Sequence, residues 1–215
     1  MPGPFFLFMN ETVLSLKDIV VSYGGERVLD GVSLDVRAGE VLGICGRNGA
    51  GKTTLISVMA GTLKPASGEV IRAAELRGQT CLVPQDIALY PSLTGRQNLD
   101  FWAETYGLTG KRKRARVDYL LGLMDLKEKA NKRVETYSGG MKRRLNMAAG
   151  LVITPKLLLL DEPTVGADDR SVSVMLGTVR RMSERGTAVV LITHITADRE
   201  GVCDRVVTLD GGKLV

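Results

Sequence analysis

Two stretches in the first part of the chain alternate apolar and polar residues. Residues 13–21 and residues 28–36 both repeat with a period of two, and the Gly24-Gly25 pair lies between them. A period of two is typical of strands that bury one face and leave the other in water, as antiparallel sheets often do. We therefore expect a small antiparallel sheet before the main core.

Other segments have the length of a strand and are apolar at nearly every position. Such segments are buried on both faces, as in parallel sheets whose strands are joined by helices. The sequence thus predicts an α/β fold with a parallel core. A short strand is expected at residues 69–71, and a hairpin at residues 205–209 and 213–215 closes the chain. The apolar segments are residues 40–45, 80–83, 157–160 and 188–193.

Helical patterns fill the intervening stretches. One helix runs to about Ala60, where Gly61 is a typical stop signal, and another covers residues 170–184. A third covers residues 141–153, and Pro155 is expected to end it because a proline disfavours helix in the residue before it.

The pattern changes between residues 92 and 135. Thr94 is a typical N-cap for a helix with Leu99 and Ala103 on one face, and a second helix carries an apolar face at residues 117–124. Because this segment interrupts the α/β core, we expect a helical subdomain at about residues 91–135. The core and the antiparallel β-subdomain then take residues 11–90 and 136–215 of one domain that spans residues 1–215, with residues 1–10 as a tail.

Composition changes this picture little. The 215 residues suffice for one domain with a substantial core. No apolar run is long enough for a transmembrane helix. The apolar residues 5–9 lack the basic flank and cleavage site of a signal peptide, so we assign them to the tail. The three cysteines, which are Cys45, Cys81 and Cys203, are widely spaced and are expected to be reduced core thiols of a cytosolic protein.

The net charge of +5 is mild, but the basic run at residues 111–116 stands out. We place it between the two helices of the 91–135 segment. Either it is a solvated helix face, or it contacts acidic lipid headgroups or a partner. It has no interleaved aromatic residues, so we do not expect nucleic-acid binding.

The segment that follows the strand at residues 40–45 has the pattern G-x-x-x-x-G-K-[ST], which is typical of a phosphate-binding loop between a strand and a helix. Its glycines let backbone N–H groups surround phosphate oxygens, and the helix N-terminus adds its dipole. Lys52 is expected to reach the β- and γ-phosphates, and the Thr53 hydroxyl to bind Mg²⁺. The loop comprises Gly46, Arg47, Asn48, Gly49, Ala50, Gly51, Lys52, Thr53 and Thr54.

Four polar side chains follow predicted strands, so they are expected to meet the loop at one edge of the sheet. Asp161 ends an apolar run, where a Mg²⁺ shared with Thr53 would compensate its charge. Glu162 would polarise a water in line with the γ-phosphate. Gln85 offers an amide oxygen to the metal or a water, and His194 is placed to contact the γ-phosphate or the attacking water.

Two further features suggest nucleotide contacts. Tyr23 either stacks on a purine ring or is an ordinary turn residue, and the sequence leaves both possibilities open. Ser138 is a good N-cap, and Gly139-Gly140 at the start of the next helix suggests that something approaches the backbone closely. This helix start is a second phosphate-binding device. Since the loop already has its own helix, the second device suggests a second copy of the protein.

Taken in order, these motifs resemble the ATP-binding subunit of an ABC transporter, over nearly all of residues 14–215. GRNGAGKTT corresponds to Walker A, YSGGMKRR to the ABC signature and LLLLDEP to Walker B. Tyr23 corresponds to the A-loop aromatic residue, Gln85 to the Q-loop, residues 165–168 to the D-loop and His194 to the H-switch. The sequence around the Q-loop and the signature is similar to that of drug, antibiotic, sodium or multidrug export systems.

The resemblance implies a P-loop NTPase fold and a head-to-tail homodimer. ATP would lie between Walker A of one subunit and the signature of the other. Glu162 would be the general base, with Lys52 and His194 as the other catalytic residues, and Thr53, Gln85 and Asp161 would hold Mg²⁺. The implied nucleotide-binding set is Tyr23, Val28, Asn48, Gly49, Ala50, Gly51, Lys52, Thr53, Thr54, Gln85, Ser138, Gly139 and Gly140.

The implied partners are a second ATPase subunit and a membrane-spanning permease, which would place the protein at the cytoplasmic face of the membrane. Two alternatives remain: a non-transport ABC ATPase acting in DNA repair or translation, and a regulatory module that binds ATP without turnover. The chain lacks the long insertions or second ATPase domain usual in the former, and Glu162 and His194 argue against the latter. The chain departs from the family pattern at Arg47 in Walker A. It also departs at Ala167 and Asp169 in the D-loop, which puts dimer packing in question.

Overall fold

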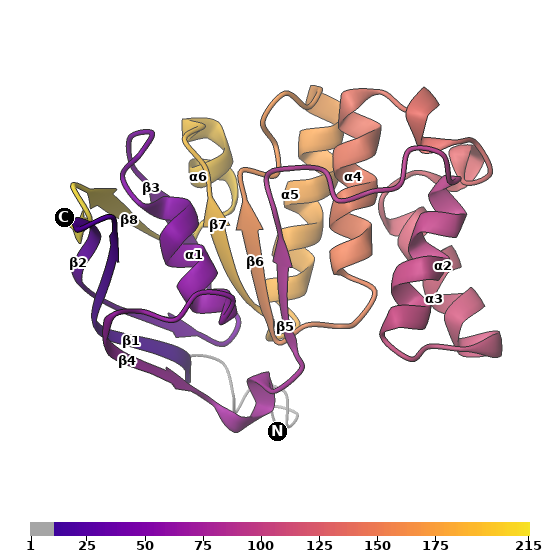
Figure 1. The fold of residues 1–215 in the computed structure, drawn as a ribbon. Helices are drawn as coiled ribbons and strands as arrows, with labels where there is room; N and C mark the ends of the chain where they lie inside the picture. The colour runs from indigo at the N-terminus through magenta and orange to yellow at the C-terminus, as the bar shows by residue number, and fades with distance from the viewer. Residues whose placement is uncertain (1–10) are drawn as a thin grey trace, which may run out of the picture. The chain divides into compact units, whose positions relative to one another are not determined.

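The computed structural model describes residues 11–215, so the tail and its apolar residues 5–9 lie outside the described part. Contacts divide the chain into two compact units (Figure 1). Within the described residues, unit 1 comprises residues 11–82, 155–162 and 179–215, and unit 2 comprises residues 83–154 and 163–178.

Unit 1 contains the predicted antiparallel sheet. Its strands are β1 (Thr12–Tyr23), β2 (Glu26–Arg37) and β4 (Ser67–Arg72), in the order β2-β1-β4. β2 alternates buried and exposed residues over most of its length, as the period of two predicted. The prediction is confirmed, and the short strand expected at residues 69–71 is the third member of this sheet.

The second sheet has the strand order β5-β6-β7-β3-β8-β9. β3 pairs in parallel with both β7 and β8, and β6 pairs in parallel with β7, so the predicted parallel core is confirmed. β9 pairs antiparallel with β8 and forms the predicted hairpin. The strands are β3 (Val41–Cys45), β5 (Thr80–Val83), β6 (Leu157–Asp161), β7 (Ala188–Ile192), β8 (Arg205–Asp210) and β9 (Lys213–Leu214).

The core of unit 1 is centred on α1 (Lys52–Ala60). This helix contacts β6 of the parallel sheet and β1 and β2 of the antiparallel sheet (Figure 1). Every residue of β3, β6 and β7 is buried, which explains why these segments are apolar throughout. Gly61 ends α1 in a left-handed conformation, as predicted. A short 3₁₀ turn, η2 (Ala74–Leu76), connects β4 to β5.

Unit 1 also contains a helix that the sequence did not predict. This helix, α6 (Thr196–Val202), lies between β7 and β8. It has seven residues, of which only Asp198 and Val202 are buried. A helix this short has no full apolar stripe, so the 3.6-residue period gave no signal.

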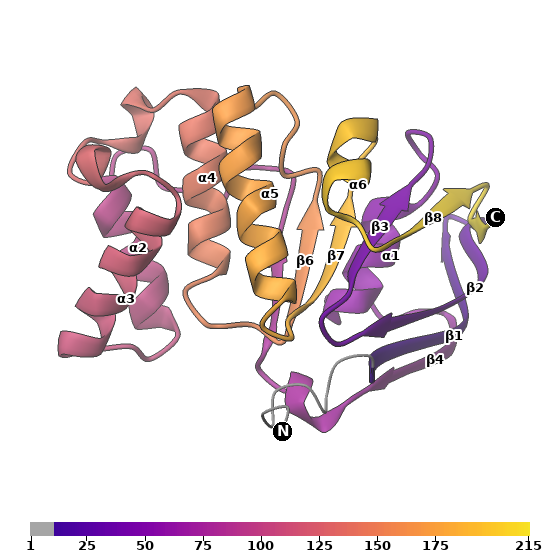
Figure 2. The same cartoon turned by 180° about the vertical axis from the view of Figure 1, so that it is seen from behind.

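Unit 2 contains three mutually contacting helices, which Figure 2 shows side by side. They are α2 (Gly95–Thr105), α3 (Gly110–Leu123) and α4 (Gly139–Gly150). Thr94 caps α2 as predicted, and it forms a reciprocal capping box with Gln97. The 3₁₀ turns η3 (Lys127–Lys129) and η4 (Val134–Thr136) lead from α3 to α4. A further helix, α5 (Asp169–Ser183), begins in unit 2 and ends in unit 1.

Two details of the sequence prediction were wrong. The basic run at residues 111–116 does not lie between two helices but forms the first turns of α3. The helix expected to end at Pro155 stops at Gly150 instead. Both corrections involve Arg116, whose guanidinium donates to the carbonyls of Leu151, Val152 and Ile153 just after α4. A side chain from α3 therefore supplies hydrogen-bond donors to the carbonyls that directly follow α4.

Candidate functional site

The phosphate-binding loop adopts a backbone that glycine makes possible. Gly46, Gly49 and Gly51 all have positive φ angles, of 151°, 81° and 99°. A Cβ on Gly46 would overlap the carbonyl oxygen of Leu209, and one on Gly51 would lie 2.8 Å from the carbonyl oxygen of Val28. The predicted nucleotide-binding residue Val28 therefore lies directly against the loop. Any side chain at Gly46 or Gly51 would push the loop away from its neighbours.

Lys52 folds back into its own loop. Its ammonium group donates to the carbonyl oxygens of Gly46 at 2.9 Å and Arg47 at 3.0 Å. Gly51 precedes α1, and no side chain caps the helix N-terminus. The free N–H groups and the lysine together make a site suited to an anion. Among the other predicted loop residues, Ala50 is buried, Asn48 is exposed and Thr54 is half-buried.

Asp161 is hydrogen-bonded to the phosphate-binding loop. The Thr53 hydroxyl donates to its Oδ2 at 3.0 Å across a sequence separation of 108 residues. The Asp161 residue is 4% exposed. Burial raises the pKa of this carboxyl, whereas the bond from Thr53 and the charge of Lys52 lower it. A buried carboxylate beside a hydroxyl is the donor set that a hard cation such as Mg²⁺ takes.

No group of three or more His, Cys, Asp or Glu residues within residues 11–215 could hold a metal ion by itself. The Thr53–Asp161 pair fits a cation whose remaining ligands are phosphate oxygens and water, since Mg²⁺ commonly binds in this way.

Glu162 and His194 lie side by side at the ends of neighbouring strands. His194 Nδ1 is 3.5 Å from Glu162 Oε1. The glutamate side chain is 12% exposed and the histidine side chain 54% exposed. Glu162 has φ 48°, a conformation that is uncommon for a residue with a side chain. The Glu162 N–H donates to the carbonyl oxygen of Ile192, and this bond holds the residue that follows β6 against the end of β7.

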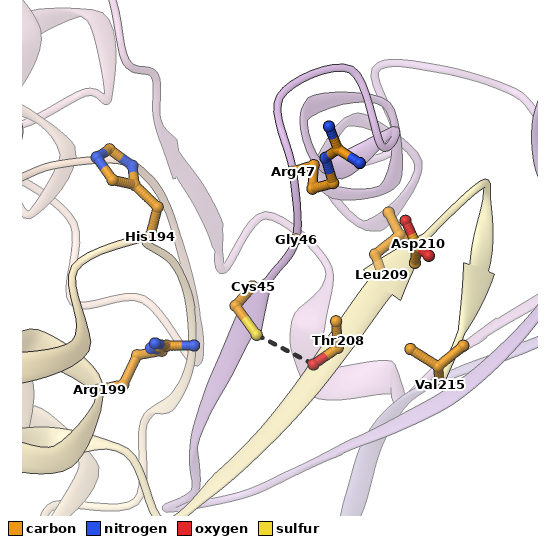
Figure 3. A pocket seen from close by; sticks show the side chains of 9 residues that line it. All are labelled: Cys45, Gly46, Arg47, His194, Arg199, Thr208, Leu209, Asp210 and Val215. Carbon is orange, nitrogen blue, oxygen red and sulfur yellow. Dashed lines mark hydrogen bonds between the residues drawn. The ribbon is translucent and has the colours of Figure 1, made fainter.

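A cavity of about 330 Å³ lies beside Gly46, between the loop, β8 and α6 (Figure 3). Three basic side chains line it, from Arg47, His194 and Arg199. At its wall, Cys45 Sγ is 3.2 Å from Thr208 Oγ1. Sequence reasoning missed Arg199 because the helix that carries it was not predicted.

Tyr23 lies at the end of β1 and is 54% exposed. Its ring therefore has an open face, as stacking on a purine requires.

The remaining predicted residues belong to unit 2. The Ser138 hydroxyl accepts a hydrogen bond from the Met141 N–H at 3.2 Å, which confirms the predicted N-cap of α4. Gln85 is exposed, and its carbonyl oxygen accepts a bond from Arg143. The expected approach of Gln85 to Asp161, Glu162 and His194 stays a prediction because these three residues belong to unit 1.

The two glycines of the signature have different environments. A Cβ on Gly140 would overlap the side chains of Asp168 and Ser171. A Cβ on Gly139 would meet only the carbonyl oxygen of Gly166, at 3.7 Å. The close approach that the sequence suggested is thus made at Gly140 by the chain itself, while Gly139 has an open face.

The chain matches a known protein family over more than half of its length. Residues 29–165 match the family model described as ABC transporter. The chain belongs to the ABC transporter family. It is an ATP-binding subunit with ATPase activity.

Three relatives illustrate the group within the family. The linearmycin resistance ATP-binding protein LnrL of Bacillus subtilis is 38% identical, with 94% of this chain and 68% of the relative aligned. The daunorubicin resistance ATP-binding protein DrrA3 of Streptomyces coeruleorubidus is 39% identical, over 96% and 68%. The Nod factor export ATP-binding protein I of Burkholderia orbicola is 34% identical, over 96% and 71%. These relatives support the transport interpretation over a non-transport ATPase.

Solved ABC structures have the same fold. An ATP-binding subunit of an ABC transporter superposes with a TM-score of 0.84 at 30% identity, covering 94% of this chain and 88% of the other. The ATP-binding cassette MJ0796, solved as a dimer bound to ADP and Pi in a post-hydrolysis state, gives a TM-score of 0.83 at 25% identity. That alignment covers 94% of this chain and 96% of the cassette. The expected P-loop NTPase fold is therefore confirmed. No helix of the described residues is long and apolar enough to cross a membrane.

Proposed function

We propose that the protein powers export through a separate membrane-spanning permease, as one of two identical ATPase subunits at the cytoplasmic face of the membrane. The observation that carries this proposal is the presence of two phosphate-binding devices in one chain. One is the loop at Lys52 with the Thr53–Asp161 and Glu162–His194 pairs, and the other is the capped start of α4 at Ser138. The first site carries the residues proposed for catalysis. The second site would bind the nucleotide held by another copy of the protein.

Phosphate binding begins with a change of partner at Lys52. In the present structure its ammonium satisfies two loop carbonyls. When ATP enters, the ammonium turns to the β- and γ-phosphate oxygens, and the uncapped N–H groups of α1 complete the cradle. Tyr23 stacks on the base, while Val28 supports the loop from below through its contact with Gly51.

Mg²⁺ would be bound by Thr53 and Asp161, with Gln85 as a further oxygen ligand. When bound, the ion neutralises charge that builds up on the phosphates. The buried Asp161 carboxylate, which has few partners in this structure, is thereby compensated.

Glu162 acts as the general base. Its carboxylate accepts a proton from the water that attacks the γ-phosphate. His194, 3.5 Å away, orients this carboxylate and contacts the γ-phosphate. The pair projects from the ends of β6 and β7, so two rigid neighbouring strands fix its geometry.

The second subunit would close the site. The MJ0796 cassette is dimeric, and we infer that this chain dimerises head to tail, so that Ser138, Gly139 and Gly140 of one copy cover the ATP bound by the other. The open face of Gly139 supports this arrangement, because a phosphate can approach its N–H without obstruction. The resistance and export relatives support export as the direction of transport.

The test is ATP hydrolysis by the purified full chain with Mg²⁺. We expect Glu162→Gln to lower kcat by at least about a hundredfold, in the range that loss of a general base produces. Glu75→Gln, which changes an exposed residue of η2, is the matched control and should hydrolyse ATP like the wild type. Equal turnover by wild type and Glu162→Gln would contradict the proposal.

A further inference from the structure

Arg144 is a buried cation in the signature helix. It is 6% exposed and lies on α4, and its Nη1 donates to the carbonyl oxygens of Met124 at 2.7 Å and Asp125 at 3.0 Å. The same nitrogen is 3.5 Å from Asp125 Oδ2. Within the described residues its Nε has no partner. A buried guanidinium needs this compensation, which comes from the turn that follows α3.

Asp125 binds a second arginine. Its Oδ2 is 2.5 Å from Nη2 of Arg170, which lies in the first turn of α5. The residue itself has φ 54°, so its backbone is turned into the left-handed region to present the carboxylate. One carboxylate therefore joins the signature helix α4 to the start of α5, and all three residues belong to unit 2.

A second contact links the same two elements. Gly140 at the start of α4 lies against Asp168 and Ser171, with no room for a Cβ. Asp168 accepts hydrogen bonds from the N–H of Ser171 at 2.9 Å and from its hydroxyl at 2.8 Å. These bonds lower the pKa of Asp168, and the charge of Arg144 contributes to the effect. Gly140 of the signature and Asp168 of the D-loop, residues 165–168, therefore pack directly against each other.

We propose that Asp125 is a positioning residue, whose carboxylate joins Arg144 and Arg170 and thereby sets the angle at which Ser138-Gly139-Gly140 meets the ATP of a second subunit. This inference rests on the proposed function. The Arg170 side chain is 74% exposed, so its ion pair contributes little to folding by itself. The ion pair instead fixes the orientation of α4 relative to the start of α5, because the three charged side chains form one network.

The variants are compared in a Glu162→Gln background, using the full chain with ATP and Mg²⁺. Asp125→Asn removes the charge but tolerates a left-handed backbone. Arg170→Gln removes the exposed cation and leaves the partners of Arg144 in place, so it reports on the bridge even if Asp125→Asn folds poorly. Arg170→Lys is the conservative rescue. ATP affinity of the monomer is measured at low protein concentration, and dimer formation is measured by sedimentation velocity.

We expect unchanged ATP affinity of the monomer for all variants. The ATP concentration for half-maximal dimerisation should rise about tenfold for Asp125→Asn and for Arg170→Gln, within the range of coupling between linked sites. Combining the two should add nothing further, because both break one network. Arg170→Lys should dimerise like the parent. Asp118→Asn, on α3 and paired with Arg96, is the matched control and should not shift dimerisation.

Two results would overturn the inference while leaving the proposed function in place. One is a shift for Asp125→Asn no larger than that for Asp118→Asn, and the other is full additivity of Asp125→Asn and Arg170→Gln. Failure of the Glu162→Gln parent to dimerise with ATP would overturn both the inference and the proposed function.

Discussion

The hydroxyl of Thr53 donates a hydrogen bond to Asp161 at 3.0 Å, which joins the first turn of α1 to the end of β6. This bond places a buried carboxylate beside the phosphate-binding loop. Burying a carboxylate costs stability, and we propose that the protein tolerates this cost because Asp161 binds Mg²⁺ when ATP is present.

Asp161→Asn tests this trade-off. Burial raises the pKa of Asp161 in the folded protein, so the ionised carboxylate lowers stability at pH values above its folded pKa. We expect the variant, without nucleotide, to have a higher Tm than the wild type at about pH 7. The difference should narrow as the pH falls from about 7 towards the ordinary pKa of an aspartate, because the wild-type carboxyl then takes up a proton. The variant should also lose ATPase activity. Thermal scans across this range are the measurement, and a lower Tm for the variant at pH 7 would contradict the account.

Arg116→Ala tests how α4 is terminated. The guanidinium donates to three carbonyls after α4 and lies over the Tyr119 ring, and burial lowers its pKa. Because the bonds are made by a charged donor, we expect a loss of about 2 kcal/mol in the free energy of unfolding, measured by urea denaturation. Arg112→Ala removes an exposed cation from the same helix and should change it by less than about 0.5 kcal/mol. Equal losses in the free energy of unfolding for the two variants would contradict a specific role of the Arg116 hydrogen bonds.

Gly140→Ala and Gly139→Ala should separate folding from dimerisation. At Gly140 the added methyl overlaps Asp168 and Ser171, so we expect about 1–3 kcal/mol of destabilisation, as for other overpacked sites. At Gly139 the methyl has room, so the monomer should keep its stability and bind ATP normally. If Gly139 faces the nucleotide of a second copy, ATP-dependent dimerisation of the Glu162→Gln form should weaken. Urea denaturation measures stability, and sedimentation measures dimerisation. A stable Gly140→Ala variant together with a destabilised Gly139→Ala variant would contradict these assignments.

The cysteines should differ in their reactivity. Burial raises the pKa of Cys81 to about 12 and that of Cys203 to about 11. Only the thiolate is nucleophilic, so both should react slowly with an iodoacetamide reagent at about pH 8 in the folded protein, and Cys81 most slowly. In denaturant all three thiols should react at similar rates. Mass spectrometry of labelled peptides gives the rates, and rapid labelling of Cys81 in the native protein would show that its strand opens.

Much of the fold could be predicted because its signals are local. The alternating residues of β2, the apolar runs of β3, β6 and β7, and the caps at Thr94 and Gly61 each depend on a few neighbouring residues. What escaped prediction depends on distant partners or on very short elements. The carbonyls that follow α4 bond to Arg116, which is more than 30 residues away, and α6 is too short to show a period.

The site shows the same division. The order of strand ends correctly indicated that Thr53 and Asp161 would meet, because parallel strands end at one edge. The order of strand ends could not show why residue 140 must be a glycine. The side chain that leaves no room for a Cβ there belongs to Asp168, in a later loop. The Asp125 bridge was equally hidden, since an acidic residue after a helix carries no sequence signal of its two arginine partners.

We propose that each ATP is shared between the loop of one copy and the start of α4 of another. Mixing two inactive variants tests it most directly. Lys52→Ala disables the loop, and Ser138→Arg blocks the start of α4 but should leave ATP binding by the monomer intact. In a mixed dimer, the intact loop of one chain faces the intact signature of the other. We predict that equal amounts of the two variants recover roughly a quarter of wild-type ATPase activity, as random pairing of a symmetric dimer gives. A mixture that stays as inactive as each variant alone would contradict the shared site.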